Sequence, residues 1–124
     1  MGIQAEGIEA EQWLLREFIK KGTKVFQPDV ISLESNKWVV NEVKHQERFT
    51  PPPFEGHGLP RWQIETRMNF WKTTGIRIRL VIKEKGSDNV FWQWLDILES
   101  KEYCDTHGLK PRRIYPLTNF EIRK

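Results

Sequence analysis

Paired cysteines, long hydrophobic runs and internal repeats are all missing from this sequence. Its single cysteine, Cys104, excludes an intrachain disulfide. No apolar stretch approaches the roughly 18 residues that a membrane-spanning helix needs, and no basic-then-apolar leader is seen. Glycine-rich phosphate loops and nucleophilic triad patterns are missing too, which argues against those two kinds of chemistry. We therefore expect a cytoplasmic protein, in a reducing compartment and without membrane association.

Charge, by contrast, is plentiful. The chain has 20 Lys and Arg against 17 Asp and Glu, a net charge of +3, and 38% hydrophobic residues in 124. Its length predicts a single domain over residues 1–124 with one modest core. A mildly basic balance permits a nucleic-acid partner without requiring one. The last fifteen residues carry five cations against Glu121 alone, and this segment is either a solvated tail or a phosphate-contacting element.

Hydrophobic periodicity and turn residues predict a mixture of helices and strands. A short strand at 25–26 is also possible. The order favours an α/β or α+β domain with a central mixed β-sheet flanked by helices. The main predicted elements are a helix over 6–21, a β-hairpin over 29–33 and 38–43, a helix from 59 or 60 to 74, strands over 76–83 and 90–98, and extended structure over 112–122 with a short turn at Pro116.

The segment from Phe49 to Pro60 interrupts this pattern. It contains three successive prolines, which cannot lie inside a helix or a central strand. We predict a surface loop on the rim of the site that the flanking elements build. His57, within it, is expected to be a free surface histidine, with a contact to substrate as the alternative.

Asp29, Glu42 and Lys44 form the pattern that carries chemistry. Side chains alternate along a strand, so Glu42 and Lys44 point to the same face. Asp29 begins the partner strand of the hairpin, which places it near the end of the neighbouring strand that bears Glu42. Carboxylate oxygens with waters are what Mg²⁺ accepts, and the backbone carbonyl of Val43 is a further candidate ligand. The simpler alternative is an ordinary ion pair on a solvated strand, with Asp29 as a turn residue.

Glu11 is a second source of a carboxylate. Ile8, Glu11, Leu15 and Phe18 are spaced by three, four and three residues, which puts Glu11 on the apolar, core-facing stripe of the first helix. It either enters a metal site or lies near the positive end of the helix dipole and reaches solvent. The spacing leaves both possibilities open.

These residues resemble the PD-(D/E)xK nuclease superfamily, which includes restriction enzymes and Holliday-junction resolvases. The resemblance covers roughly residues 7–83 and implies a restriction-endonuclease-like core. It implies that Asp29, Glu42 and Glu11 bind Mg²⁺ or Mn²⁺, that Lys44 assists the attacking water, and that Gln63 supports the site; the Val43 carbonyl would complete the metal ligands. A tyrosine that some branches carry four residues after that glutamine is replaced here by Arg67.

The function implied by the resemblance is metal-dependent hydrolysis of phosphodiester bonds in DNA, by a homodimer acting on branched junctions. The alternative is a nucleic-acid-binding or assembly protein on the same fold that does not cleave. Contacts with the DNA backbone are expected from five cationic residues, with a solvated helix face as the competing interpretation for the first two: Arg61, Arg67, Lys72, Arg112 and Arg113.

Overall fold

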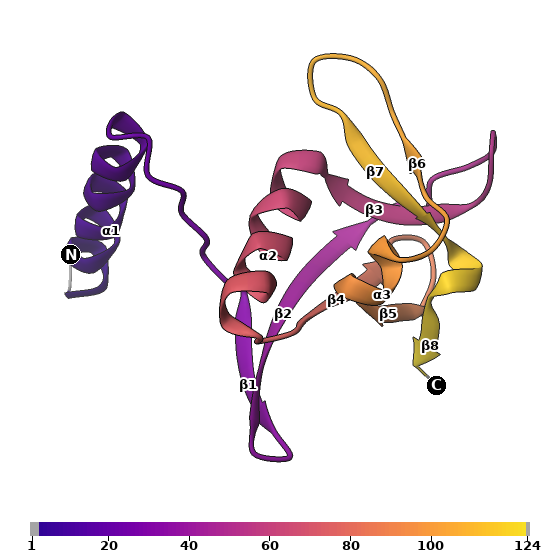
Figure 1. Ribbon diagram of the computed structural model, residues 1–124, viewed down its shortest axis with the longest axis horizontal. Helices are drawn as coiled ribbons and strands as arrows, with labels where there is room; N and C mark the ends of the chain where they lie inside the picture. Colours follow the sequence, from indigo (N-terminus) through magenta and orange to yellow (C-terminus); the bar gives the residue numbers. More distant parts are fainter. Residues whose placement is uncertain (1–2, 124) are drawn as a thin grey trace.

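Two β-sheets and three α-helices make up residues 3–123, the part of the chain that the computed structural model describes (Figure 1). The larger sheet has the strand order β1-β2-β4-β5-β8, and β2 and β4 run parallel while the other neighbours are antiparallel. The predicted mixed sheet with helices is therefore confirmed. Its strands are β1 (Val30–Glu34), β2 (Lys37–Gln46), β4 (Ile78–Glu84), β5 (Val90–Trp94) and β8 (Glu121–Arg123).

The β1–β2 hairpin forms as predicted. Ser35 and Asn36 have φ angles of 50° and 62°, and two such residues in succession make the type of two-residue turn that matches strand twist. Pairing with β1 ends at Val30 opposite Asn41. Strand β2 continues to Gln46. Within this sheet, its last five residues therefore pair with β4 on one side and have no neighbouring strand on the other side.

Helix α2 (Arg61–Thr74) covers one face of the larger sheet, as predicted. It ends at Gly75, which has φ 75° and a left-handed conformation. The predicted strand over 90–98 is half right, because strand β5 stops at Trp94 and α3 (Leu95–Glu99) follows. Leu95 and Leu98 are both buried, and their spacing of three suits a helix that packs beside α2 against the sheet.

The prediction of a surface loop up to Pro60 is wrong in its last five residues. Gly56–Pro60 is strand β3, which lies in a second sheet with β7 (Arg112–Pro116) and β6 (Cys104–Asp105). A Cβ at Gly58 would overlap the carbonyl oxygen of Arg113, and one at Gly56 that of Tyr115. The glycines therefore serve close approach of two backbones, which a turn-like composition conceals.

The extended structure predicted over 112–122 is confirmed, with a short 3-10 turn at Leu117–Asn119 directly after Pro116. The short strand predicted at 25–26 is wrong, because these residues lie in an irregular connection. None of the helices within residues 3–123 combines the length and apolar character needed to cross a membrane.

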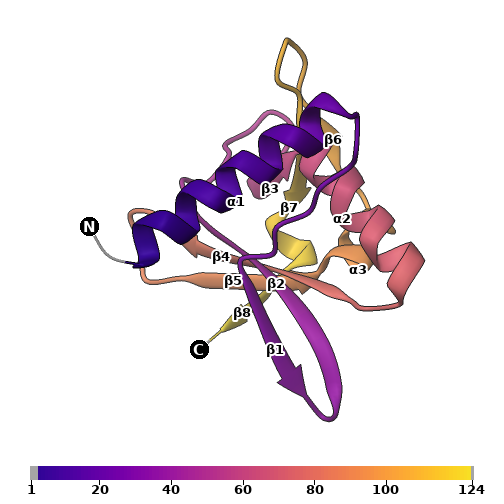
Figure 2. The same cartoon turned by 90° about the vertical axis from the view of Figure 1, so that its left-hand side faces the viewer.

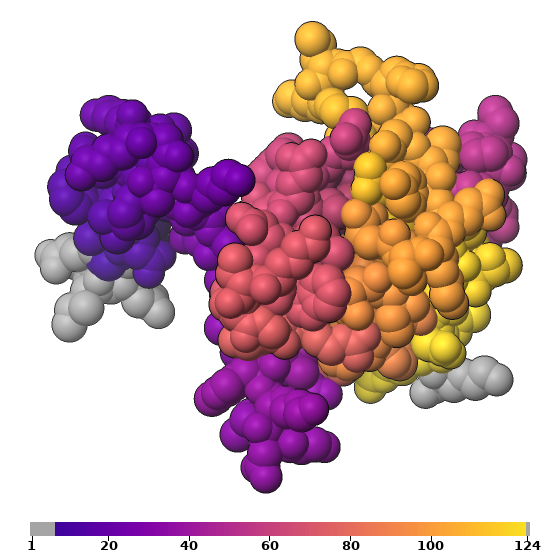
Figure 3. Space-filling model, viewed as in Figure 1, coloured from indigo at the N-terminus to yellow at the C-terminus, as the bar shows by residue number. Residues whose placement is uncertain are grey.

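Helix α1 (Ile3–Lys20) confirms the predicted first helix, but it stands apart from the body (Figures 1 and 3). Figure 2, viewed from that side, shows α1 crossing in front of the sheets and α2. Large apolar side chains on it are exposed, namely Ile8, Trp13, Leu14 and Ile19. On the expected core-facing stripe, Ile8 and Glu11 are exposed, whereas Leu15 and Phe18 are half-buried. The expectation is therefore wrong at Glu11, while Leu15 lines a groove together with Trp62 and Arg67 of α2.

A buried polar cluster joins the two sheets. Glu84 accepts hydrogen bonds from Arg48 Nε and Nη2, both at 3.0 Å, and from Ser87 Oγ at 2.9 Å. His57 Nε2 lies 2.7 Å from Glu84, and His57 Nδ1 lies 3.1 Å from Gln46 Oε1. The expectation of a surface histidine is wrong, because His57 is 1% exposed. Burial lowers the pKa of His57, against the opposing effect of Glu84.

Acid should weaken the fold through Glu84. Burial by itself raises the pKa of this carboxyl, but hydrogen bonds from Arg48, His57 and Ser87 outweigh it and hold the pKa at about 2. A depressed pKa stabilises the fold above the unfolded value of 4.5 and that contribution is lost as pH falls toward 2. We expect a loss on the order of 3 kcal/mol in the free energy of unfolding between about pH 5 and pH 2 from this residue.

Urea unfolding at several pH values measures this loss in wild-type protein and in Glu84→Gln. The variant should be less stable than wild type at pH 7 and less dependent on pH below 5. The exposed Glu121→Gln variant is the matched control and should follow wild type. A Glu84→Gln profile that runs parallel to wild type would contradict the assignment.

Candidate active site

Glu42 is a carboxylate buried within the core. Its side chain lies on the face of β2 that α2 covers, beside Leu80 of β4, and it is 2% exposed. A buried charge of this kind needs a partner. Arg67 Nη2 on α2 lies 3.2 Å from both carboxylate oxygens, and Lys44 Nζ lies 3.4 Å from Oε1. Two cations therefore hold one carboxylate.

Asp29 reaches the same place from the start of β1. Its Oδ2 accepts a hydrogen bond from the backbone N–H of Val43 at 2.9 Å. The backbone N–H and C=O of one strand residue point to the same side of the strand. In β2 the backbone groups of even-numbered residues point toward β4, as the hydrogen bonds of Val40 and Gln46 show. The carbonyl of Val43 therefore faces the edge at which Asp29 lies, beyond the last β1–β2 pair.

Gln63 and Arg67 lie one turn apart on α2, and Arg67 reaches Glu42 from there. Arg67 Nη1 donates to the carbonyl oxygen of Gln63 at 3.4 Å. Within residues 3–123, the buried atoms Gln63 Oε1 and Arg67 Nε have no hydrogen-bond partner. Nearly all buried polar atoms in native proteins are paired, so this donor and acceptor mark a place for a water or ligand.

The connection before β1 holds the guanidinium of Arg67 from the other side. Phe26 places its ring 4.7 Å from the Arg67 Cζ atom, and it packs edge-on against Phe70 at 5.0 Å between centroids. A cation over an aromatic face is attracted by the ring quadrupole. The same connection therefore positions Arg67 and delivers Asp29 three residues later.

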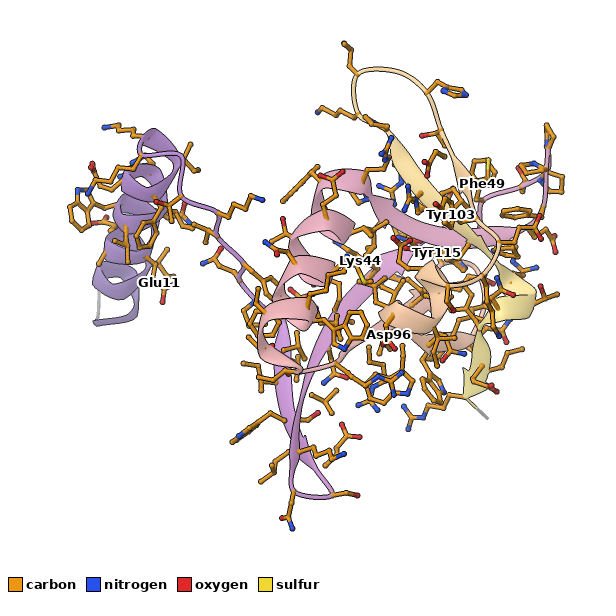
Figure 4. All side chains as sticks on the ribbon, viewed as in Figure 1. Glu11, Lys44, Phe49, Asp96, Tyr103 and Tyr115 are labelled. Atoms are coloured by element: carbon orange, nitrogen blue, oxygen red, sulfur yellow. The ribbon has the colours of Figure 1, made fainter. Side chains whose placement is uncertain are left out.

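The structure brings four of the predicted site residues together. Asp29, Glu42, Val43 and Lys44 meet at the edge of β2, and Gln63 is linked to them through its backbone carbonyl, which accepts from Arg67. Glu11 does not join them. It lies on α1, well away from Lys44, in the view that labels both (Figure 4).

The predicted nucleic-acid contacts fall into three groups. Arg61, Lys72 and Arg113 line one cavity of about 260 Å³ beside α2. Arg113 Nε lies 2.7 Å from Asp105 and Nη1 lies 2.8 Å from Glu99, and these carboxylates raise the pKa of its guanidinium. Arg112 lines separate cavities at the second sheet, while Arg67 is turned inward to Glu42. The structure therefore gives Arg67 and Arg113 internal partners in place of a phosphate.

Arg67 is the site residue whose position sequence reasoning missed. It was predicted on the α2 surface, whereas its side chain is 8% exposed. One signal was present: Ile64, Arg67 and Phe70 recur every three residues, so Arg67 lies on the stripe that faces the core. A cation on that stripe requires a buried anion, and Glu42 is the carboxylate on the neighbouring strand.

The arrangement offers oxygen donors and positive charge at one edge. Two carboxylates and one backbone carbonyl are suited to a hard divalent cation, and Mg²⁺ usually takes only one or two protein carboxylates. Among residues 3–123, no cluster of three or more His, Cys, Asp or Glu side chains is arranged to hold a metal. Waters or a ligand would complete the coordination shell.

No protein-family model matches the chain, and no curated protein matches its sequence. Among solved structures, the chain is similar to Hjc of Archaeoglobus fulgidus, a Holliday junction resolvase from an archaeal hyperthermophile. The two share 18% sequence identity over 85% of this chain and 84% of that chain, with a TM-score of 0.46.

Proposed function

We propose that this protein is a metal-dependent nuclease that hydrolyses phosphodiester bonds in DNA. One observation carries the proposal: Asp29, Glu42, Lys44 and the Val43 carbonyl converge at the open edge of β2. A solvated ion pair would not bury Glu42 to 2% exposure or draw Asp29 onto the backbone of the same strand. A site for a polymer needs such an edge, because the substrate must reach it from outside.

The oxygen donors of the site fit Mg²⁺ or Mn²⁺. Asp29, Glu42 and the Val43 carbonyl would hold the ion, and the buried acceptor Gln63 Oε1 would bind one of its waters. When bound, the ion polarises a phosphodiester and lowers the pKa of a bound water. Glu42 already contacts Arg67 and Lys44, so one of these cations must yield an oxygen to the metal.

Lys44 and Arg67 have different tasks in this proposal. Lys44 is 27% exposed at the mouth of the site, which allows its ammonium group to turn from Glu42 toward a phosphate or an attacking water. Arg67 is enclosed by Phe26, Gln63 and Glu42. It acts as a positioning residue that fixes the Glu42 carboxylate between α2 and β2.

DNA binding is assigned to the cations that the structure leaves near the surface. Arg61 and Lys72 border the cavity beside α2. Arg112 borders a different cavity, which Pro60 and Trp62 at the start of α2 also line. Phosphate contacts of this kind position a duplex or strand without reading its sequence. The small fold favours recognition of DNA shape, as at branches or junctions, in recombination or repair.

A homodimer is part of the proposal and accounts for Glu11. Helix α1 exposes Trp13, Leu14 and Ile19, which favours packing against a second copy. If α1 of one copy packs on the body of the other, Glu11 can reach the partner's Asp29–Glu42 edge. The metal site would then gain its third carboxylate in trans.

A non-cleaving nucleic-acid-binding protein is the second candidate function. The observation that favours it is the charge balance around Glu42, because Arg67 and Lys44 already neutralise Glu42 without a metal, and Asp29 already accepts a hydrogen bond from the Val43 N–H. In that case Arg67 would be a permanent substitute for the ion. Binding of DNA would persist in EDTA, and cleavage would not occur.

Cleavage of labelled DNA tests the main proposal. Linear duplex, single strand, flap and four-way junction are incubated with Mg²⁺, with Mn²⁺ and with EDTA. Cutting should require metal. In Lys44→Ala and Glu42→Gln the cleavage rate should fall by at least about 100-fold, the size of effect expected when one proton-transferring or charge-stabilising group is lost. Lys37→Ala, at the hairpin turn, is the control. Wild-type binding without cutting on any substrate would favour the second candidate.

Arg67→Met tests whether metal and guanidinium compete for Glu42. Removing one partner of a buried ion pair costs about 3–5 kcal/mol, so the variant should melt well below wild type in EDTA. Mn²⁺ should raise its melting temperature more than that of wild type, because a metal then neutralises Glu42. Lys44→Met, which leaves the Arg67 contact intact, provides a milder version if Arg67→Met fails to fold. Equal Mn²⁺ shifts in all three proteins would argue against a metal at Glu42.

Mixing two inactive variants tests the placement of Glu11. In a mixed dimer of Glu11→Ala and Lys44→Ala, exchange of α1 leaves one body with its own Lys44 and the partner's Glu11. Mixing, after denaturation and refolding together, should therefore restore cleavage that neither variant shows alone. If Glu11 served its own chain, every site in the mixture would lack one group and activity would stay absent.

A further inference from the structure

A slot lies between the first turn of α2 and the connection from β6 to β7. It encloses about 580 Å³ and is lined by Pro60, Trp62, Leu109, Lys110, Pro111 and Arg112. The β6–β7 connection projects from the body above α2 (Figures 1 and 3). Trp62 is 64% exposed, and Leu109 is fully exposed.

The walls of this slot combine flat apolar surface with positive charge. Trp62 and the two prolines provide the apolar walls, while Lys110 and Arg112 provide the charge. The Arg112 backbone is held by Thr106 Oγ1 at 2.9 Å, and its Nη2 donates to the Gly58 carbonyl at 3.1 Å. These bonds leave further guanidinium N–H donors for a ligand, because arginine has five.

The slot adjoins the candidate active site through Trp62. Trp62 also lines a second groove of about 330 Å³, together with Gln27 and Arg67 and with Leu15 and Ile19 of α1, which form its opposite wall. Gln63 is the next residue along α2, and Arg67 bonds to Glu42. A strand that passes the Asp29–Glu42 edge and continues over the first turn of α2 therefore meets Trp62.

We propose that this slot binds an unpaired base of the DNA strand whose backbone lies at the Glu42 edge, by stacking on Trp62. Lys110 and Arg112 bind the adjoining phosphate. Aromatic stacking requires an exposed base face, which a base within an uninterrupted duplex does not offer. The inference rests on the proposed function, and it names the substrate class: DNA with unstacked nucleotides beside the scissile bond, as in single strands, flaps and forks.

Charge argues for a nucleotide over a protein segment in this slot. Lys110 and Arg112 line it, and none of its lining residues is acidic. The nearest carboxylate contact of Arg61, to Asp105, is long at 3.8 Å. Apolar walls that include one aromatic ring, beside two cations, match a base and its phosphate.

Binding in EDTA tests the proposal without depending on cleavage. Fluorescence anisotropy compares wild type with Trp62→Ala on three DNAs: a single strand, a fork and a fully paired duplex. The loss of one stacked base should weaken single-strand and fork binding by roughly 5- to 100-fold and duplex binding by less than about twofold. Trp62→Phe should retain much of the binding, because a phenyl ring still stacks.

Trp38→Ala is the matched control, since Trp38 is 57% exposed at the β1–β2 turn. It should bind all three DNAs as wild type does. Quenching of 2-aminopurine placed at successive positions of the fork should be strongest at one unpaired position and vanish in Trp62→Ala. Lys110→Ala should make the slope of log K against log salt concentration shallower by about the amount that one phosphate contact contributes.

Two results would overturn the proposal. Equal binding by Trp62→Ala and wild type on the single strand and fork would show that Trp62 does not stack. A wild-type dimer that becomes a monomer in Trp62→Ala, by light scattering, would show that a second copy covers the slot. Failure of the nuclease proposal looks different: wild type would not cut, yet Trp62-dependent binding in EDTA would remain.

Discussion

The ion pair between Glu42 and Arg67 constrains the whole arrangement. It joins β2 to α2 inside the core, where a lone carboxylate would be several kcal/mol less stable than in water. Because α2 leads into β4, which pairs in parallel with β2, the pair also sets how the crossover lies on the sheet. Lys44, Gln63 and Phe26 then take positions around these two charges. The stability of the fold and the geometry of the candidate site therefore depend on one contact.

The second sheet shapes the surface on which a strand of DNA would lie. Gly56 and Gly58 let β3 approach β7 at backbone distance, and the amide of Gln46 bonds to both backbone groups of Gly58, which ties β3 to the end of β2. The contact between His57 of β3 and Glu84 of β4 ties the two sheets together at the same junction. Since β3 leads directly into α2, the same junction sets the position of Trp62 beside the β6–β7 connection.

Local patterns predicted most elements, and they failed where distant contacts intervened. The hairpin, α2 and β4 follow from alternation, turn residues and the stop at Gly75. The segment around Gly56 and His57 has the composition of a loop, yet it is a buried strand, because its glycines match a partner strand almost 60 residues later. Arg67 has the composition of a surface residue, yet a carboxylate 25 residues earlier draws it inward. Neither partner is visible from spacing along the chain.

The sequence by itself determined the Asp29, Glu42 and Lys44 pattern, because strand alternation and a two-residue turn place these side chains through local geometry alone. It also determined the mixed sheet with a helical crossover. Only the tertiary structure decided that Arg67 neutralises Glu42, that Glu11 stands apart on α1, and that Trp62 borders a cationic slot. Those outcomes depend on which distant segments share a face or an edge, and that choice is made by burial and charge pairing across the fold.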